Sequence, residues 1–433
     1  MGRRAKAPRT PQPKETKMKA WSQITHYAAL DWARDHHDIV MVDRSGAIVT
    51  EFRIPHSTEG WKDFRSRLAP FPDLAIAVET NQGPAVEQMA AAGLQIYPVN
   101  PRSAKHYRDR KRPSGVKNDR IDAWSLADAL RVDGHGWRPL VPEDPLVAEL
   151  RILCRDEVSL IELRTSLVAQ LRYTLHRYYP AALEAFEDWT YPTCWDFLVQ
   201  YPTPGILAAA GPRKWRAWLT SHKFHFPAAN EKRYEVFARA TELQGCAATV
   251  AAKSLTAVSL AKVLRTLEAQ LRDFRRQIAD RFEKHPDHAL FGSLPGAGPK
   301  MAPRLLSELG ADRTRFPSAD VLQCYAGTAP ISYQSGQTDR TLMRRACNLE
   351  LRQAVHIWAS LSMRKSAWAY AYYLKHRKDG QSHSCALRCL GQRWLNILWK
   401  MWQSHTCYDP DLHQKNQLKH GSWVLKLETE NTR

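Results

Sequence analysis

The sequence lacks the features that would place it in a membrane or in an oxidising compartment. No run of about 18 or more apolar residues occurs, so we expect no transmembrane span. The N-terminus is basic but has no apolar core like that of a secretory signal. The eight cysteines include no C-x-x-C pair and suggest no disulfide framework. These absences predict a protein of the reducing cytoplasm.

A zinc site is also not favoured. His383, Cys385 and Cys389 would share one face of a helix, but no fourth ligand is evident. Buried free cysteines are common in proteins, so we interpret these two as ordinary packing residues.

Acidic residues are comparatively few. The chain of 433 residues holds 44 Asp and Glu against 63 Lys and Arg, a formal net charge of +19 that is spread along its length. Such a balance predicts a polyanionic partner, and nucleic acid is favoured over a membrane surface. Fifteen Trp and fifteen Tyr suit stacking on bases, although most large aromatic residues simply fill cores.

Composition and hydrophobic patterning divide the chain into five parts. We expect a disordered basic arm over 1–20, an α/β domain over 21–140, a helical coiled-coil region with a Trp-rich insert over 141–290, a mostly helical C-terminal domain over 291–405 and a polar tail over 406–433. The fold class is therefore α/β followed by all-α.

The N-terminal domain shows a definite order of strands and helices. Strands are expected at 27–30, 38–42 and 47–54, then a helix from Ser57 or Thr58 to 68, an all-apolar strand at 74–78, a helix after Pro84, a strand at 95–99 and a helix bearing Asp119 and Asp122. Three strands in hairpins followed by alternating helices and strands is the order of a ribonuclease-H-like domain.

Four carboxylates fall at the ends of these elements. Asp31 follows the first strand and Glu79 follows the all-apolar strand, and neighbouring parallel strands would bring them together. Asp119 and Asp122 share one helix face, where like charges repel unless a cation lies between them. Together the four acids predict a site for two divalent cations about 4 Å apart, Mg²⁺ or Mn²⁺, acting on a phosphate backbone.

Each acid alone also has an ordinary explanation. D-x-x-D is common on solvated helix faces, and Asp31 capping a turn with Glu79 in solvent would serve no chemistry. The four positions together favour the metal site. Four further acids fit the elements less well and rank lower: Asp35, Asp38, Asp109 and Asp128.

Basic residues precede the acidic pair Asp119 and Asp122, and others follow Ser335 in the C-terminal domain. We expect them to contact nucleic acid: Lys105, Arg108, Arg110, Lys111, Arg112, Lys117, Arg340, Arg344 and Arg345.

The middle region carries two apolar seams at coiled-coil spacing. The first is Leu146, Leu150, Leu153, Leu160, Leu163, Leu167, Leu171 and Leu175, and the second is Leu260, Leu264, Leu267, Leu271, Phe274, Ile278 and Phe282. The two helices can pair within the chain or with a second protomer, and we favour a role in assembly. Between them, residues 180–250 form a Trp- and Pro-rich insert that we expect to be irregular.

Two glycine-containing motifs mark the C-terminal domain. Residues 294–298, Leu-Pro-Gly-Ala-Gly, precede a helix and resemble the hairpin of helix-hairpin-helix modules, which binds a DNA phosphate; an ordinary glycine-rich turn is the alternative. A small-residue loop over 324–337 ends with Ser335 and Gly336. A serine exposed among arginines can attack phosphorus if its pKa is lowered, but alone it is only a loop serine.

Taken together, these residues resemble the DEDD-type transposases of the IS110 insertion-sequence family, including its IS1111 subgroup. Asp31, Glu79 and the run Asn118–Asp122 look like that family's acids, and Tyr325–Pro330 with Gln334–Gly336 looks like its second domain. The resemblance implies a RuvC-like domain, a coiled coil and a transposase domain in which Ser335 forms a phosphoserine link to DNA. It also implies Mg²⁺ held by the four acids, a noncoding bridge RNA that pairs with donor and target DNA, and dimers that assemble to a tetramer.

The sequence therefore favours a recombinase of a bacterial mobile element, acting on the nucleoid. Two alternatives remain open at this point. One is a RuvC-like metal-dependent structure-specific endonuclease with a passive Ser335, and the other is a nucleic-acid-binding protein without catalytic activity.

Overall fold

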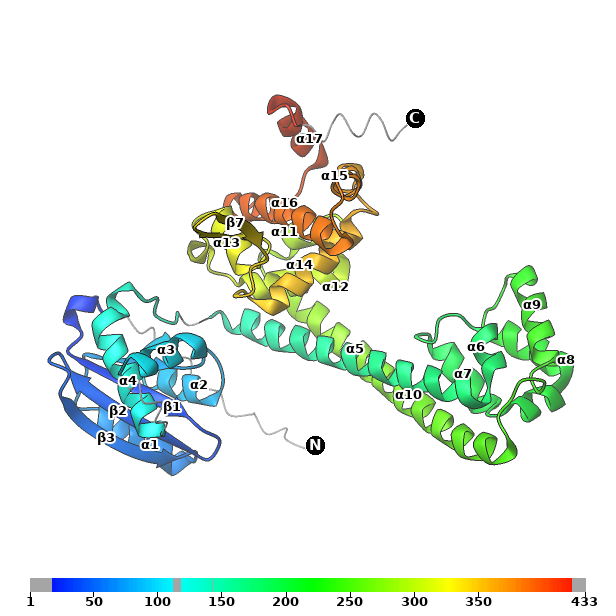
Figure 1. Cartoon of the computed structure of the whole chain (residues 1–433), viewed down its shortest axis with the longest axis horizontal. Coiled ribbons are helices and arrows are strands. Elements are labelled where there is room, and N and C mark those ends of the chain that lie inside the picture. Colours follow the sequence, from blue (N-terminus) through cyan, green and yellow to red (C-terminus); the bar gives the residue numbers. More distant parts are fainter. Residues whose placement is uncertain (1–17, 112–117, 142, 423–433) are drawn as a thin grey trace, which may run out of the picture. The chain divides into compact units, whose positions relative to one another are not determined.

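The structure is a computed structural model that describes residues 18–111, 118–141 and 143–422. The chain forms two compact units, residues 1–142 and 143–433, and each is described here by itself (Figure 1). Most of the expected basic arm lies outside the described residues, as do Arg112, Lys117 and the end of the polar tail.

The first unit is built on a mixed five-stranded sheet. Its strands are β1 (His26–Trp32), β2 (His36–Asp43), β3 (Ile48–Pro55), β4 (Leu74–Val78) and β5 (Gln95–Pro98), in the order β3-β2-β1-β4-β5. β1, β2 and β3 are antiparallel neighbours, whereas β4 is parallel to β1 and β5 is parallel to β4. All five predicted strands are confirmed. β4 lies inside the sheet and every one of its residues is buried, as its all-apolar sequence predicts.

Helices cover both faces of this sheet. α1 (Thr58–Leu68) and α2 (Pro84–Ala91) pack on one face through residues such as Phe64 and Met89. α3 (Pro101–Lys111) and α4 (Asp119–Asp133) contribute Ala104, Leu126 and Leu130 to the core on the other face. Short 3-10 turns, η1 (Trp21–Gln23) and η2 (Gly134–Gly136), flank the unit. The predicted helices are present, and α3 is an addition that the sequence reasoning did not separate from the basic approach to α4.

Two long helices dominate the first part of the second unit. α5 (Pro145–Tyr178) and α10 (Ala247–Glu283) lie side by side (Figure 1). Three ion pairs fix their direction: Glu149–Arg281 at 2.9 Å, Glu157–Arg275 at 2.9 Å and Arg164–Glu268 at 2.7 Å. The residue numbers rise along α5 from Glu149 to Arg164, while those of the partners on α10 fall from Arg281 to Glu268. The two helices are therefore antiparallel. The predicted seams therefore pair within the chain, while a role in assembly remains a prediction.

α10 is also long and apolar enough, by length and composition alone, to cross a membrane. This is weak evidence because core helices of soluble proteins pass the same test. Here α10 makes charged pairs with α5 in its C-terminal half, at Glu268, Arg275 and Arg281.

The Trp-rich insert is helical, so the expectation of irregular structure was wrong. It contains α6 (Pro180–Ala185), α7 (Pro192–Gln200), α8 (Pro204–Ser221) and α9 (Pro227–Ala238). Each of these helices begins at a proline, where the missing N–H would have no partner in any case. These four prolines thus start helices, whereas Pro212 lies inside α8 beside Gly211, whose non-helical φ and ψ kink the helix. Trp189, Trp195, Trp215 and Trp218 are buried together with the ends of α5 and α10.

The rest of the second unit is mostly helical. It comprises α11 (His288–Gly292), α12 (Gly298–Leu309), η3 (Arg313–Arg315), α13 (Ala319–Tyr325), β6 (Ile331–Ser335), β7 (Thr338–Leu342), α14 (Leu349–Ser362), α15 (Ala367–Lys378), α16 (His383–Ser404) and α17 (Pro410–Lys419). Trp358, Trp394 and Trp402 are fully buried in its core. The polar tail contains α17, and the loop predicted over 324–337 is in part a β-hairpin.

Candidate active site

A row of polar residues crosses the first unit's sheet where β1 and β4 end. Asp31 of β1 lies opposite Asp38 of β2, which lies opposite Arg53 of β3. On the other side, Leu30 is level with Val78 of the parallel strand β4, so Glu79 follows next to Asp31. Directly opposed residues point to the same face of a sheet. This register brings together the two acids that the sequence placed at strand ends.

Strand alternation directs these acids to the face covered by α4. Tyr27 and Ala29 belong to the core beneath α3 and α4, and Asp31 continues their alternation. Ala75 and Ala77 do the same for Glu79. The carboxylates therefore end the apolar rows that pack against α4.

The first turn of α4 supplies the second pair of acids. Asn118 caps the helix, and its side chain accepts a hydrogen bond from the Ile121 N–H at 2.8 Å. Asp119 and Asp122 consequently occupy the first turn, where the positive end of the helix dipole favours carboxylates. The cap thus fixes where the D-x-x-D motif begins.

Electrostatics show that all these acids converge. Burial has the largest effect on the Asp31 carboxyl, followed by the charges of Asp122, Glu79, Asp119 and Asp38, and together they raise its pKa from 3.8 to about 7. Four carboxylates therefore act on the fifth. A site with so much negative charge, in which Asp31, Glu79, Asp119 and Asp122 offer carboxylate oxygens, fits divalent cations of the Mg²⁺ or Mn²⁺ type.

Arginines neutralise part of this charge. Arg108 of α3 donates from Nη1 to both carboxylate oxygens of Asp122, at 3.0 and 3.1 Å, and these bonds and the charge of Asp122 raise the Arg108 pKa. Arg53 donates to both oxygens of Asp38, at 3.0 and 2.8 Å. Arg108 was expected to contact nucleic acid, but here it contacts an acid of the site.

Ser335 lies on an exposed hairpin of the second unit. It ends β6 and pairs with Thr338 of β7, so a two-residue turn of Gly336 and Gln337 joins the strands. Gly336 has a φ of 56°, which suits a type II′ turn with glycine in its first central position. Arg340 lies opposite Tyr333, two residues before Ser335, and therefore shares its face of the hairpin.

The Leu-Pro-Gly-Ala-Gly motif leads into a helix, α12, as predicted, and the structure adds the short helix α11 before it. Gly296 has a φ of 78°, and a Cβ there would lie 2.6 Å from the backbone nitrogen of Ser362. Only glycine permits this close approach of the turn to α14. A surface pocket with Arg364 and Lys365 in its wall adjoins the turn, whose role in binding a DNA phosphate stays a prediction.

Comparisons with known proteins match both units. A family model described as a transposase, of the DEDD type of IS110, covers residues 28–180, and one described as the transposase IS116/IS110/IS902 family covers residues 288–374. A Streptomyces coelicolor protein named for the IS117 mini-circle transposase is 32% identical over 405 residues, which is 89% of this chain and 96% of that protein. The chain belongs to the IS110/IS116/IS902 transposase family.

Two further relatives come from other insertion elements. A 42 kDa protein of IS900 from Mycobacterium paratuberculosis is 28% identical and covers 87% of this transposase and 95% of its own length. A 44.8 kDa protein of IS116 from Streptomyces clavuligerus is 25% identical, and the match covers 89% of this chain and 96% of that protein. The first family match spans all four predicted acids, and the second spans Ser335.

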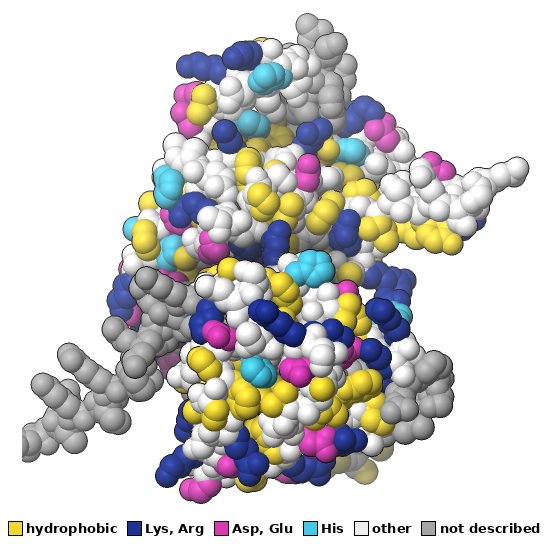
Figure 2. Space-filling model, turned by 90° about the vertical axis from the view of Figure 1, so that its left-hand side faces the viewer, with side chains coloured by type: hydrophobic (Ala, Val, Ile, Leu, Met, Phe, Trp, Pro, Cys, Tyr) yellow, Lys and Arg dark blue, Asp and Glu magenta, His cyan; other side chains and the backbone are white. Residues whose placement is uncertain are grey.

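Nine basic residues were expected to contact nucleic acid, and the structure describes seven of them. Lys105 and Arg110 are exposed on α3, whereas Lys111 pairs with the buried Asp128. Arg340 and Arg345 are exposed around the hairpin, and Arg344 is half-buried, with its side chain donating to the Ala329 carbonyl oxygen. Arg112 and Lys117 lie outside the described residues. Lys and Arg side chains are scattered over the face shown in Figure 2 and do not gather in one patch.

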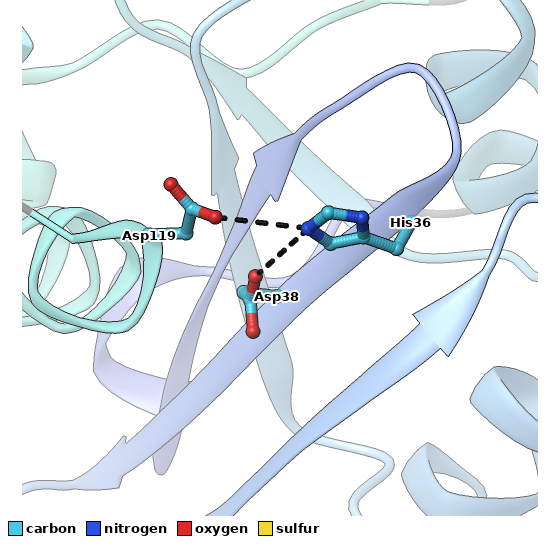
Figure 3. A group of neighbouring side chains, drawn as sticks. All are labelled: His36, Asp38 and Asp119. Carbon is cyan, nitrogen blue, oxygen red and sulfur yellow. Dashed lines mark ion pairs between the residues drawn. The ribbon is translucent and has the colours of Figure 1, made fainter.

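Sequence reasoning missed two members of the acidic region. Asp38 was ranked low, yet it lies directly opposite Asp31, and the hairpin register was the signal that would have shown this. His36 was not considered at all, although it shares a strand face with Asp38. Its Nε2 lies 3.6 Å from Asp119 and 3.9 Å from Asp38 (Figure 3).

Proposed function

We propose that this transposase is an RNA-guided recombinase that cleaves and rejoins DNA through a covalent link to Ser335. Its first unit is proposed to be a RuvC-like domain of the RNase H fold, in which Asp31, Glu79, Asp119 and Asp122 hold divalent cations. One observation carries the metal part of this proposal: Asp31 and Glu79 follow adjacent parallel strand positions under the first turn of α4, where burial and four neighbouring carboxylates together raise the Asp31 pKa to about 7.

The strands and the helix that carry the four acids position them for binding cations. Asp31 lies in β1, Glu79 directly follows the paired strand β4, and Asp119 and Asp122 begin a capped helix, so the backbone positions of all four acids are set before any ligand arrives. When bound, the cations would polarise the phosphate and stabilise charge on the attacking and leaving oxygens. Arg108 holds one carboxylate of the set in a fixed orientation.

Ser335 is proposed as the nucleophile. Its Oγ forms a bond to a backbone phosphorus, the bond from that phosphorus to the leaving deoxyribose oxygen breaks, and the serine proton ends on that leaving oxygen. The reverse step, with the end of another strand as nucleophile, rejoins DNA without any external energy source. Arg340, on the same hairpin face, is placed to balance negative charge developing on the phosphate.

Guidance by RNA and assembly are proposed from the family resemblance and the charge of the chain. A net charge of +19 suits a protein that holds phosphate backbones while base pairing selects the sequence. We propose that a bridge RNA supplies this pairing with donor and target DNA, and that protomers assemble as dimers into a tetramer. Serine and acids would then come from different protomers, in the cytoplasm and on nucleoid DNA.

Ser335→Ala tests the serine chemistry, and the hairpin offers a matched control. Ser332 is also exposed on β6 but lies on the opposite strand face, so Ser332→Ala should leave strand exchange intact. Ser335→Ala should abolish both strand exchange and the protein–DNA adduct, with DNA binding unchanged. DNA cleavage that survives in Ser335→Ala would favour the metal-dependent structure-specific endonuclease, with the acids activating water.

RNA guidance needs its own test. The protein is expressed with its native flanking DNA and purified, and the RNA that accompanies it is sequenced. One discrete structured RNA from beside the gene is expected, and its loops should match the recombined sites. Random cellular RNA in preparations that still cut branched DNA would refute guidance.

A further inference from the structure

His36, Asp38 and Asp119 form a cluster beside the four proposed catalytic acids. One nitrogen and two carboxylate oxygens from these residues lie within 4.8 Å of one another. Among residues 18–111, 118–141 and 143–422, no other group of His, Cys, Asp and Glu side chains meets this condition. Figure 3 shows Asp38 and Asp119 both approaching the same ring nitrogen of His36.

Local structure explains why the three meet. His36 and Asp38 are two residues apart on β2 and so point to the same face, while His37 between them is buried on the other face against Trp61. α4 packs over β1 and β2 and begins with Asp119 directly after its Asn118 cap. The cluster is therefore assembled by the strand period and by the helix start.

The spacing does not suit direct hydrogen bonds. His36 Nε2 lies 3.6 Å from Asp119 Oδ2 and 3.9 Å from Asp38 Oδ2, beyond the usual hydrogen-bond range. This nitrogen is shut off from solvent and has no hydrogen-bond partner, although the histidine as a whole is only half-buried. Two donor atoms that each lie about 2.1 Å from the same cation are about 3.4–3.9 Å apart when the donor–cation–donor angle is tetrahedral or somewhat wider. The two distances from His36 Nε2 match those between donors to a shared ion.

Arg53 provides a cation to this cluster from the protein itself. It donates to both oxygens of Asp38, and its Nη2 lies 3.6 Å from Asp119 Oδ2. The Arg53 side chain is 55% exposed, so it can turn into solvent without losing a packed position. A metal ion would thus compete with Arg53 for the same two carboxylates.

We propose that His36, Asp38 and Asp119 form a mixed-donor site for a transition-metal dication such as Mn²⁺, Co²⁺ or Zn²⁺ in preference to Mg²⁺. An imidazole nitrogen favours these ions, whereas Mg²⁺ prefers oxygen donors alone. Three protein ligands leave coordination positions open for water or a phosphate oxygen. The site shares Asp119 with the proposed catalytic acids but does not depend on the serine chemistry.

Titration of the metal-free full-length protein with Co²⁺ tests the proposal, because bound Co²⁺ has a visible spectrum that reports its ligands. His36→Ala should weaken Co²⁺ binding by at least about tenfold, since losing even an outer partner of a metal ligand costs about 10–100-fold. Mg²⁺ affinity, followed by calorimetry, should change less than threefold in the same variant. Arg53→Ala should tighten Co²⁺ binding, because the competing cation is gone.

Two controls make the result decisive. His135→Ala removes an exposed histidine of η2 in the same unit and should leave the Co²⁺ spectrum and affinity unchanged. Asp122→Asn alters the four acids but not this cluster, so the spectral signature of His36 should persist in it. The proposal would be overturned if His36→Ala kept the wild-type Co²⁺ spectrum and affinity. It would also be overturned if this variant lost Mg²⁺ affinity by the same factor as Co²⁺ affinity. Ser335→Ala should not affect Co²⁺ binding, so a failure of the recombinase proposal would be seen separately.

Discussion

Replacing Asp31 by Asn should stabilise the metal-free protein, although it removes a proposed catalytic group. The folded state partly buries the Asp31 carboxyl and holds it among like charges, and together these raise its pKa from 3.8 to about 7. A carboxyl with a raised pKa destabilises the fold as it ionises, so the penalty grows from about pH 4 to pH 7 and is constant above. Asn cannot ionise and escapes this penalty.

The magnitude follows from the same pKa. A rise of this size corresponds to about 4 kcal/mol before screening. Asp31 is only partly buried, and solvent and salt screen its neighbours, so we expect about 1–2 kcal/mol at pH 8. That amounts to an increase of about 5–30-fold in the protection of amides whose exchange requires opening of the unit.

Hydrogen exchange followed by mass spectrometry on peptides from β1 and β4 measures this effect directly. Asp31→Asn should be more protected than wild type at pH 8 without metal, and the difference should shrink towards pH 4. Saturating Mg²⁺ should reverse the order, because a ligand at 100 times its Kd adds about 2.7 kcal/mol to a protein that binds it.

Asp63→Asn is the control for this experiment. Asp63 of α1 is only half-buried, with a side chain that is 44% exposed, and it pairs with Arg67 one turn away at 2.8 Å, so its loss should change stability by less than about 0.5 kcal/mol. The electrostatic reasoning fails if Asp31→Asn gains no more protection than Asp63→Asn at pH 8, or if both respond equally to Mg²⁺.

Three further predictions concern other parts of the chain. Gly296→Ala should destabilise the second unit by more than about 2 kcal/mol in denaturant unfolding, because its Cβ meets the Ser362 backbone, whereas Gly298→Ala, also at positive φ but in open space, should cost about 1 kcal/mol. Arg155→Ala should cost about 3–5 kcal/mol in the same assay, since it removes the charged partner of the buried Glu308 at 2.8 Å and leaves the neutral Asn348 amide as its hydrogen-bond donor. A loss of the size expected for a surface ion pair, below about 1 kcal/mol, would contradict this. Nucleic-acid affinity should fall steeply between about 50 and 200 mM salt in a binding titration, and a flat response would refute the electrostatic account of binding.

Local patterns in the sequence determined most of the first unit by themselves. The all-apolar run Leu74–Val78, the Asp43–Gly46 turn and the Ser57 cap each act through neighbours within a few residues, so they identify strands, hairpin and helix without tertiary information. The D-x-x-D pair was fixed in the same way by its helix and the Asn118 cap.

The second unit shows where local reasoning reached its limit. Leu264, Leu271 and Ile278 were recognised as a seam from spacing alone, but only packing decided that α10 pairs with α5 of the same chain. The prolines of the insert were misread because a proline at the first position of a helix looks, in sequence, like one that interrupts it.

Tertiary structure alone decided the composition of the site. Asp38 faces Asp31 only through the register of β1 and β2, and Arg108 reaches Asp122 only because α3 packs on α4. His36 and Asp119 are 83 positions apart in the sequence, so no local sequence pattern indicates that they are neighbours in the fold. The sequence by itself determined which acids end which elements, whereas the charges that surround each acid, and hence its pKa and its cation partners, depend on distances that only the folded chain sets.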